Sequence, residues 1–316
     1  MDDRVSESSE QRPEPLPDDS PFFQLRPSPA SPGLFAEIFV GPNGLRGGWR
    51  LLLFVLIAVC IEFALSFVAS AVYPRHAPFW FGLVPQMIPA ITVMTSAVIM
   101  GVYENRRFGE YGLPGSLAFG GLFWAGMFWG IAGLSLLMLA LRGAHAFDFG
   151  HLALHGTRIV IFAAYYAVSF LLVGFFEEFA FRGYSQFTLA TGMGFWPSAL
   201  LLSSVFGAGH LANPGEAWVG ALAAAFIGLF FCLTLRRTGN LWFAVGMHAS
   251  WDWGESYLYS VPDSGGMVKG HLLNSSFHGP RWLTGGSVGP EGSVLVFVVI
   301  AVMWIVFDRM YPGEQN

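Results

Sequence analysis

Long apolar runs dominate this sequence and limit what it can fold into. Eight of them lie near residues 49–73, 79–103, 117–141, 158–190, 196–211, 217–235, 240–259 and 293–310. A helix needs roughly 20 residues to cross a hydrocarbon core, and the runs lack the alternation typical of a membrane β-barrel. Charged residues make up 12% of the chain, against about 25% in soluble domains. The sequence therefore predicts an all-α, polytopic integral membrane helix bundle with about eight transmembrane helices.

The first 44 residues differ from the rest of the chain. They are rich in Pro, Ser, Glu and Asp and lack apolar periodicity, which is typical of disorder. They are also too long and too polar for the start of a cleaved signal peptide. We predict a disordered cytoplasmic tail over 1–44 and one membrane domain over 45–316. The two cysteines, Cys60 and Cys232, lie in apolar runs and are expected to be buried thiols.

Basic residues in the short connections predict the orientation. One side of an eight-helix arrangement receives Arg46, Arg50, Arg106, Arg107, Arg236, Arg237 and Arg309. The other side receives the sparser set Arg75, Arg142, Lys269 and Arg281. The first side is expected to be cytoplasmic, so both termini are cytoplasmic and the loop 260–292 is external. The net charge of −5 lies partly in the tail, and nothing indicates nucleic-acid binding.

Three charged residues interrupt the fourth apolar run: Glu177, Glu178 and Arg182. At membrane depth each charge costs about 2.5–3.5 kcal/mol on insertion scales, so such residues usually have a partner or a function. Glu178 and Arg182 have the spacing of a helical ion pair with the glutamate first. Glu177 points about 100° away from Glu178 and can face a cavity. A purely structural ion pair leaves Glu177 unexplained.

Two histidines occupy later apolar runs. Phe206 and His210 share one helix face, separated by small residues that let another helix approach. A lone histidine is more often a satisfied interface residue than a ligand. His248 and Asp252 also share a face. Their spacing suits two ligands of one metal, two groups beside a substrate carbonyl, or a pair that merely satisfies itself.

The expected depths of these residues agree. In a hairpin that turns near residues 191–194, Glu177 and His210 both lie roughly 24–26 Å from the turn. His248 lies roughly 15 Å past the turn at Arg237. These depths match if the first hairpin protrudes into the cytoplasm.

Together the three motifs resemble the CPBP family, the intramembrane proteases related to the type II CAAX prenyl endopeptidase. The family pattern E-E-x-x-x-R, F-x-x-x-H and H-x-x-x-(N/D/small) reads here as Glu177–Arg182, Phe206–His210 and His248–Asp252. The resemblance covers roughly 158–258. It implies a peptidase of a bacterial cytoplasmic membrane, with its site in a cavity open to the cytoplasm.

The resemblance also implies roles. Glu177 would be the general base that activates water, and Glu178 with Arg182 would support it. His210 would orient the water or bind a metal, and His248 with Asp252 would bind a metal or stabilise the oxyanion. The CAAX branch typically has asparagine at position 252, which can donate to an oxyanion as an ionised aspartate cannot.

Aspartate at this position therefore favours a metal ligand or a partner that orients His248. We expect a divalent ion, zinc, held by His210, His248, Asp252 and Glu177, while a glutamate mechanism without metal stays open. The expected partners are membrane lipids and a peptide or protein substrate, lipidated or not. The alternatives are a non-catalytic membrane binding or immunity protein and an ion-coupled transporter. The transporter is disfavoured because the sequence shows no inverted repeat.

Overall fold

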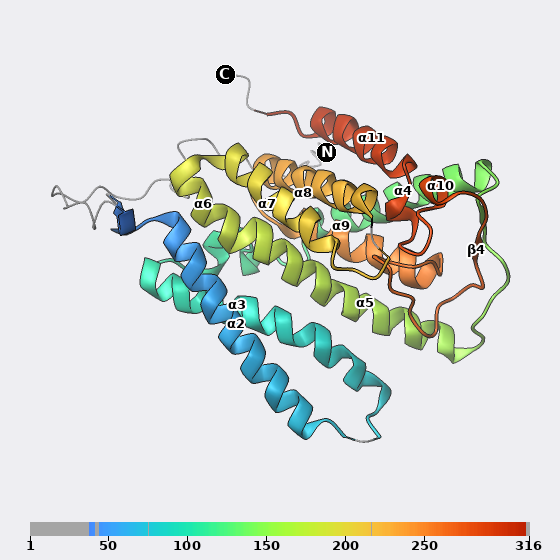
Figure 1. The fold of residues 1–316 in the computed structure, drawn as a ribbon, viewed down its shortest axis with the longest axis horizontal. Helices are drawn as coiled ribbons and strands as arrows, with labels where there is room; N and C mark the ends of the chain where they lie inside the picture. The colour runs from blue at the N-terminus through green and yellow to red at the C-terminus, as the bar shows by residue number, and fades with distance from the viewer. Residues whose placement is uncertain (1–37, 42–43, 75, 216, 314–316) are drawn as a thin grey trace, which may run out of the picture.

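The computed structural model describes residues 38–41, 44–74, 76–215 and 217–313, and nearly all regular structure in them is helical (Figure 1). The main helices are α2 (Gly47–Val72), α3 (Val84–Glu104), α4 (Gly121–Gly143), α5 (Thr157–Glu178), α6 (Gln186–Met193), α7 (Phe195–His210), α8 (Trp218–Thr238), α9 (Trp242–Trp253), α10 (Arg281–Thr284) and α11 (Leu295–Met310). This confirms the predicted all-α class.

Short elements join these helices. They are the 3-10 turns η1 (Phe79–Leu83), η2 (Phe108–Tyr111), η3 (Gly115–Leu117) and η6 (Pro290–Gly292), and the π-helical turns η4 (Phe179–Ser185) and η5 (Gly254–Leu258). Two antiparallel pairs complete the set: β1 (Val40–Gly41) with β2 (Gly44–Leu45), and β3 (Phe147–Asp148) with β4 (Ser276–Phe277). The first pair falls at the end of the range 1–44 predicted to be disordered. Residues 1–37 of that range lie outside the described residues.

Each of the eight predicted apolar runs contains a helix. Five helical segments are long and apolar enough to cross a membrane: Gly47–Val72, Phe79–Glu104, Gly121–Gly143, Thr157–Met193 and Trp218–Thr238. The other three runs form α7 with 16 residues, α9 with 12 and α11 with 16. These are shorter than the roughly 20 residues of a full span. The chain is thus an integral membrane helix bundle, and eight crossings stay a prediction.

Burial differs sharply between peripheral and central helices. Only 6% of the apolar window of α2 is buried, against 61% for α8. Phe63 of α2 is 75% exposed, as expected for a side chain that faces lipid. Cys60 lies on this helix and is exposed, while Cys232 of α8 is buried, and both thiols are free. The prediction of a buried Cys60 was wrong because α2 lies at the edge of the bundle.

The fourth run is bent rather than straight. After Glu178 the α-helix passes into the π-helical turn η4, where Gly183 has the non-helical angles φ −83° and ψ −115°. A side chain at Gly183 would place its Cβ 2.7 Å from the Phe179 ring. Insertions of this kind bend helices and often accompany functional sites. The bend follows directly after the two glutamates in the chain.

Basic connections meet at one end of the bundle. Arg50 of α2 lies 3.4 Å from Glu104 of α3, and it donates to Thr191 Oγ1 in the last turn of α6. Arg237 of α8 pairs with Asp308 of α11 at 2.5 Å. This is the end of the bundle at which the sequence predicted the arginines to gather.

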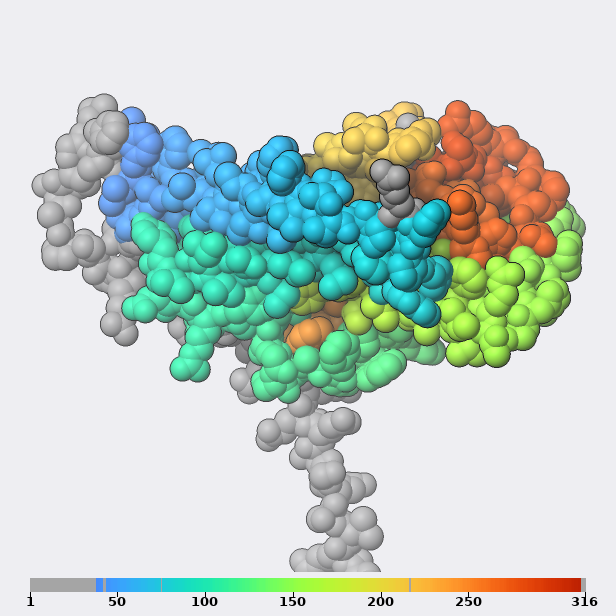
Figure 2. Space-filling view, turned by 90° about the horizontal axis from the view of Figure 1, so that it is seen from below, coloured from blue at the N-terminus to red at the C-terminus, as the bar shows by residue number. Residues whose placement is uncertain are grey.

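The opposite end is formed by the start of α5, the β3–β4 pair and the loop 260–292 (Figure 1). This loop is packed onto the segment before α5, since Ala153 N donates to Leu272 O and Asn274 N to His151 O. Figure 2 shows the same separation: the orange surface of this loop and the yellow-green start of α5 lie together, far from the blue start of α2.

Candidate functional site

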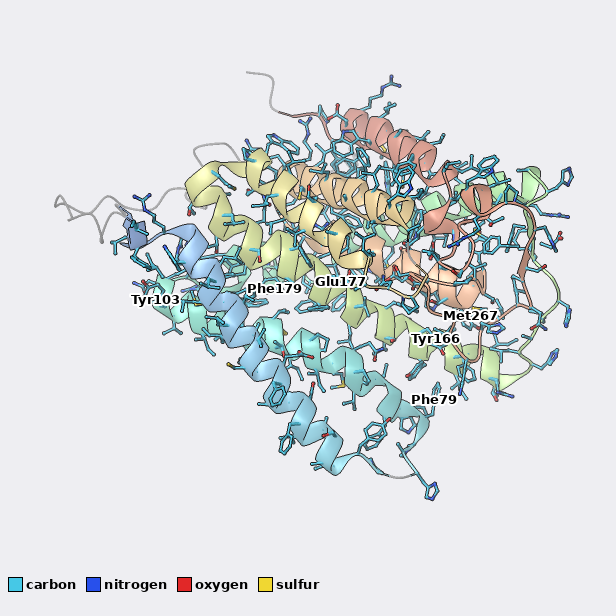
Figure 3. The ribbon with its side chains drawn as sticks, viewed as in Figure 1. Phe79, Tyr103, Tyr166, Glu177, Phe179 and Met267 are labelled. Atoms are coloured by element: carbon cyan, nitrogen blue, oxygen red, sulfur yellow. The ribbon has the colours of Figure 1, made fainter. Side chains whose placement is uncertain are left out.

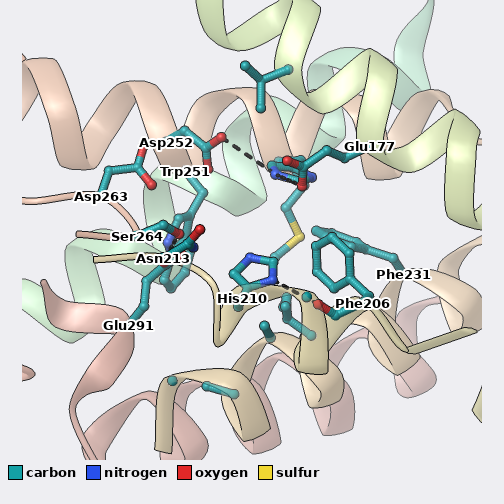
Figure 4. Close-up of a pocket in the computed structure, with 18 of the residues that line it drawn as sticks. Glu177, Phe206, His210, Asn213, Phe231, Trp251, Asp252, Asp263, Ser264 and Glu291 are labelled. Carbon is teal, nitrogen blue, oxygen red and sulfur yellow. Dashed lines mark hydrogen bonds and ion pairs between the residues drawn. The ribbon is translucent and has the colours of Figure 1, made fainter. Parts of the chain in front are cut away.

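A cavity of about 420 Å³ lies between α5, α7, α8, α9 and α11 (Figure 4). Its walls are mostly apolar and aromatic. The polar and charged residues that line it are Glu177, His210, Asn213, His248, Asp252, Asp263, Ser264 and Glu291. Glu177, His210, His248 and Asp252, which the sequence analysis singled out as catalytic, therefore share one cavity.

The two adjacent glutamates face different surroundings, as predicted. Glu178 is completely buried and its Oε1 lies 3.1 Å from Arg182 Nη1, itself 1% exposed. Glu177 has a 26% exposed side chain and lines the cavity. Figure 3 places it in the middle of the bundle. One carboxylate is thus held in an ion pair while its neighbour is available to a ligand.

Aromatic rings surround the buried guanidinium. Arg182 Cζ lies 4.3 Å from the centroid of the Phe206 ring and 5.7 Å from those of Phe181 and Phe231. Such cation–π contacts offset part of the lost hydration of an arginine. Gly228 of α8 leaves the room for Arg182 Nη2, which a Cβ at that position would strike.

His248 links the two glutamates to α9. Its Nδ1 lies 2.8 Å from Glu178 Oε1, and since a carboxylate accepts, Nδ1 is the donor. Its Nε2 lies 3.6 Å from Glu177 Oε2 and 3.5 Å from Asp252 Oδ2. Close packing of α9 on α5 makes this contact, because a Cβ at Gly174 would lie only 3.0 Å from Ala249 N.

This role of Glu178 was missed in the sequence. The i,i+4 spacing assigned the glutamate to Arg182, but Oε1 accepts from both Arg182 and His248. No local signal could have revealed the second bond, because the two residues are 70 positions apart.

His210 is the last residue of α7. Its Nδ1 lies 2.9 Å from the carbonyl oxygen of Phe206. A carbonyl only accepts, so Nδ1 donates and Nε2 carries the free lone pair. The ring stands edge-on to Phe206, with centroids 4.6 Å apart. His210 enters the cavity from α7 (Figure 4), and His248 of α9 also lines it.

The four predicted metal ligands are only partly gathered. Zinc holds its nitrogen and oxygen ligands at about 2.0–2.2 Å, and the 3.5–3.6 Å gaps around His248 Nε2 are compatible with that. However, the described residues contain one cluster of at least three side chains whose ligand atoms all lie within 4.8 Å of one another. That cluster is Glu255, Asp263 and Glu291, not the predicted set. The four predicted ligand atoms would have to draw closer together to hold one ion, so no reaction step below depends on one.

The cavity reaches the end of the bundle opposite the arginines. Asn213 follows α7, Asp263 and Ser264 follow α9, and Glu291 precedes α11, whereas the other ends of α8 and α11 meet in the Arg237–Asp308 pair. The basic connections predict the cytoplasm at the arginine end, and the resemblance implied a cavity open to the cytoplasm. The lining thus extends toward the end expected to be external, whereas the resemblance implied an opening toward the cytoplasm.

Fold and site together define an integral membrane protein with buried carboxylates and histidines around an apolar cavity. Residues 159–254 match the family model described as type II CAAX prenyl endopeptidase Rce1-like. That range contains all three motifs, and the match supports the assignment of this part of the chain to that family of CAAX-type proteases. Comparisons with curated proteins and with solved structures gave no match.

Proposed function

We propose that this protein is an intramembrane endopeptidase in which Glu177 activates the attacking water. The observation that carries the proposal is the contrast between the two neighbouring glutamates. Glu178 is buried and bonded to Arg182 and His248, while Glu177 lines the cavity. Among the described residues Glu177 has no arginine or lysine partner, and its one ion-pair neighbour is His248 Nε2 at 3.6 Å, so its carboxylate can accept a proton from water.

The proposed reaction uses groups of this chain. Water beside Glu177 gives a proton to the carboxylate and adds its oxygen to the carbonyl carbon of the scissile peptide. The proton then passes to the leaving nitrogen as the C–N bond breaks. His210, oriented by the Phe206 carbonyl, would accept a hydrogen bond from the water at Nε2. His248, held by Glu178 through Nδ1, would donate from a protonated Nε2 to the carbonyl oxygen as negative charge develops there. An apolar cavity strengthens such interactions because it excludes bulk water.

A divalent ion stays part of the proposal in an alternative form. Zinc held by Glu177, His210, His248 and Asp252 would polarise the carbonyl and acidify the water. Its support is the donor set and the aspartate at position 252, where the CAAX branch typically has asparagine. The ligand atoms would have to draw closer than they are here.

We further propose that the arginine-rich end is cytoplasmic, so both termini lie in the cytoplasm of a bacterial cell. The cavity then faces the external side of the cytoplasmic membrane. Its substrate would be a peptide or protein segment reached from that side, with apolar residues that match the aromatic walls. Lipidated and unmodified substrates both satisfy this chemistry.

The test compares Glu177→Gln with the wild type on a library of fluorogenic peptides in detergent. We expect turnover to fall by at least about 100-fold, the lower range for loss of a general base, with unchanged thermal stability. Glu62→Gln is the matched control, because Glu62 is also within a membrane helix but bonds Thr92 outside the cavity. Full turnover in Glu177→Gln would refute the assignment. A wild type that cleaves nothing would favour the non-catalytic binding or immunity protein.

A further inference from the structure

Three more carboxylates gather beside the cavity, one turn beyond Asp252. Glu255 belongs to η5, Asp263 to the following connection and Glu291 to η6. One oxygen of each lies within 4.8 Å of one oxygen of both others. Glu255 is completely buried, and the other two line the cavity (Figure 4).

No cation from the described part of the chain balances this group. The ion pairs formed by the described residues include none of the three carboxylates. Burial and the neighbouring carboxylates raise the pKa of Asp263 well above its ordinary value. Removing several like charges from water into one place is costly unless a ligand of opposite charge offsets it.

Hydrogen bonds to these three carboxylates do not occupy all of their oxygen atoms. Each carboxylate has one oxygen held by a donor: Trp251 Nε1 to Glu255 Oε1 at 2.9 Å, Ser256 Oγ to Asp263 Oδ2 at 3.2 Å, and Ser264 Oγ to Glu291 Oε2 at 3.0 Å. Glu255 Oε2 is enclosed and has no hydrogen-bond partner among the described residues. Glu178 Oε2 is also enclosed without a hydrogen-bond partner among the described residues, but its carboxylate is paired with Arg182. The Glu255 carboxylate has no such cation among the described residues, so its unpartnered oxygen is a second observation in favour of a positively charged ligand.

We propose that Glu255, Asp263 and Glu291 form a calcium site beside the cavity. One oxygen of each lies within 4.8 Å of the others, close enough for all three to bind one ion at about 2.3–2.6 Å, the range typical of calcium. A site made of protein carboxylates favours calcium, because magnesium usually keeps several waters and one or two carboxylates, and zinc prefers nitrogen or sulfur ligands.

The ion would join separate parts of the chain. It would connect the end of α9, through Glu255, to the two connections that carry Asp263 and Glu291. Because those connections form part of the cavity wall, bound calcium would fix the shape of that part of the wall. In the proposed orientation this end is external, where sites of about 10⁻⁴–10⁻³ M affinity are filled. The inference goes beyond the proposed peptidase function.

Calcium itself is the probe, titrated into the full-length protein in detergent. We expect about one ion per chain by calorimetry, a calcium-dependent rise in melting temperature, and weaker binding of magnesium. Glu291→Gln should weaken calcium binding at least about tenfold, because affinity follows ligand charge, and should abolish the rise. Asp148→Asn is the matched control: it removes a half-exposed carboxylate at the same end, outside the group, and should bind calcium like the wild type.

His248→Ala should also keep calcium affinity, which separates this site from the predicted zinc ligands. If millimolar calcium left the melting temperature of the wild type unchanged, the proposal would be overturned. The three carboxylates would then be neutralised by bound protons and not by an ion. If Glu291→Gln and Asp148→Asn weakened calcium binding equally, the binding would depend only on the overall negative charge of this end of the protein. That result would also overturn the proposal. Tighter binding of zinc than calcium at this group would refute the choice of ion. Failure of the Glu177 test would leave the inference standing, since these measurements need no turnover.

Discussion

Two groups of carboxylates lie next to each other, one around His248 of α9 and one around Glu255 of η5. They differ in whether the described residues supply a cation to balance them. Around His248, the buried Glu178 is balanced by Arg182 and by the histidine ring. One turn further on, the group around Glu255 contains no cation from the described residues. The first group contains its own cation and can support a reactive carboxylate, whereas the second, in our proposal, is balanced by a bound ligand.

The difference follows from which elements supply the residues. Arg182 is four residues after Glu178 on one helix, so the pair forms with the helix itself. The acidic group joins η5, a connection and η6, and it exists only when these segments meet. A balanced pair contributes to folding, while an unbalanced group makes folding depend on what binds to it.

The largest effect is expected from breaking the balanced group. In Arg182→Ala, Glu178 stays buried without its guanidinium, and breaking a buried pair costs about 3–5 kcal/mol. We expect a strong loss of expression and a lower melting temperature in detergent. Arg107→Ala, at an exposed position, serves as control. Equal melting temperatures for both variants would show that the pair is not structural.

A second comparison separates metal from metal-free chemistry in the balanced group. If zinc is bound, His210→Ala and His248→Ala lose both metal and activity, and Asp252→Asn loses about 10–100-fold in metal affinity or activity. If position 252 instead serves the oxyanion, Asp252→Asn keeps or raises turnover. Metal analysis and peptide cleavage in strong chelator distinguish the two. Cleavage by metal-free protein would leave a Glu177–His210 water-activating pair.

A smaller effect tests the space around the arginine. Gly228→Ala would push its Cβ against Arg182 Nη2, and overpacking costs about 1–3 kcal/mol. We expect a reduced melting temperature and reduced turnover, since Arg182 and His248 share one oxygen of Glu178. Gly48→Ala on α2, where nothing lies within 4 Å, should not reduce stability. Equal stability of both variants would mean that the guanidinium moves freely.

The last prediction concerns the side of the membrane that the acidic group faces, and it involves no change in stability. Reporter fusions at residue 20, at 108 and after 316 should report the cytoplasm, because the arginine-rich connections lie on that side. A fusion within 265–285 should report the external side. A cytoplasmic signal from this loop would invert the orientation and return the cavity to the side that the family resemblance implied.

Much of the site could be predicted because it depends on local geometry. The pairing of Glu178 with Arg182, the separate direction of Glu177 and the shared face of His248 and Asp252 all follow from the period of a helix. The apolar runs predicted where helices form, since a bilayer leaves helical segments few alternatives. The three motifs in order indicated the family that the match over 159–254 supports.

The tertiary structure alone decided the contacts between distant segments. The bond between His248 and Glu178 depends on how closely α9 packs on α5, and sequence periodicity carries no information about that distance. The convergence of Glu255, Asp263 and Glu291 depends on the path of the loop 260–292, which has no periodic pattern to follow. The end toward which the cavity extends was likewise fixed by that loop, because helix spacing determines neighbours on one helix but not the position of the connections around it.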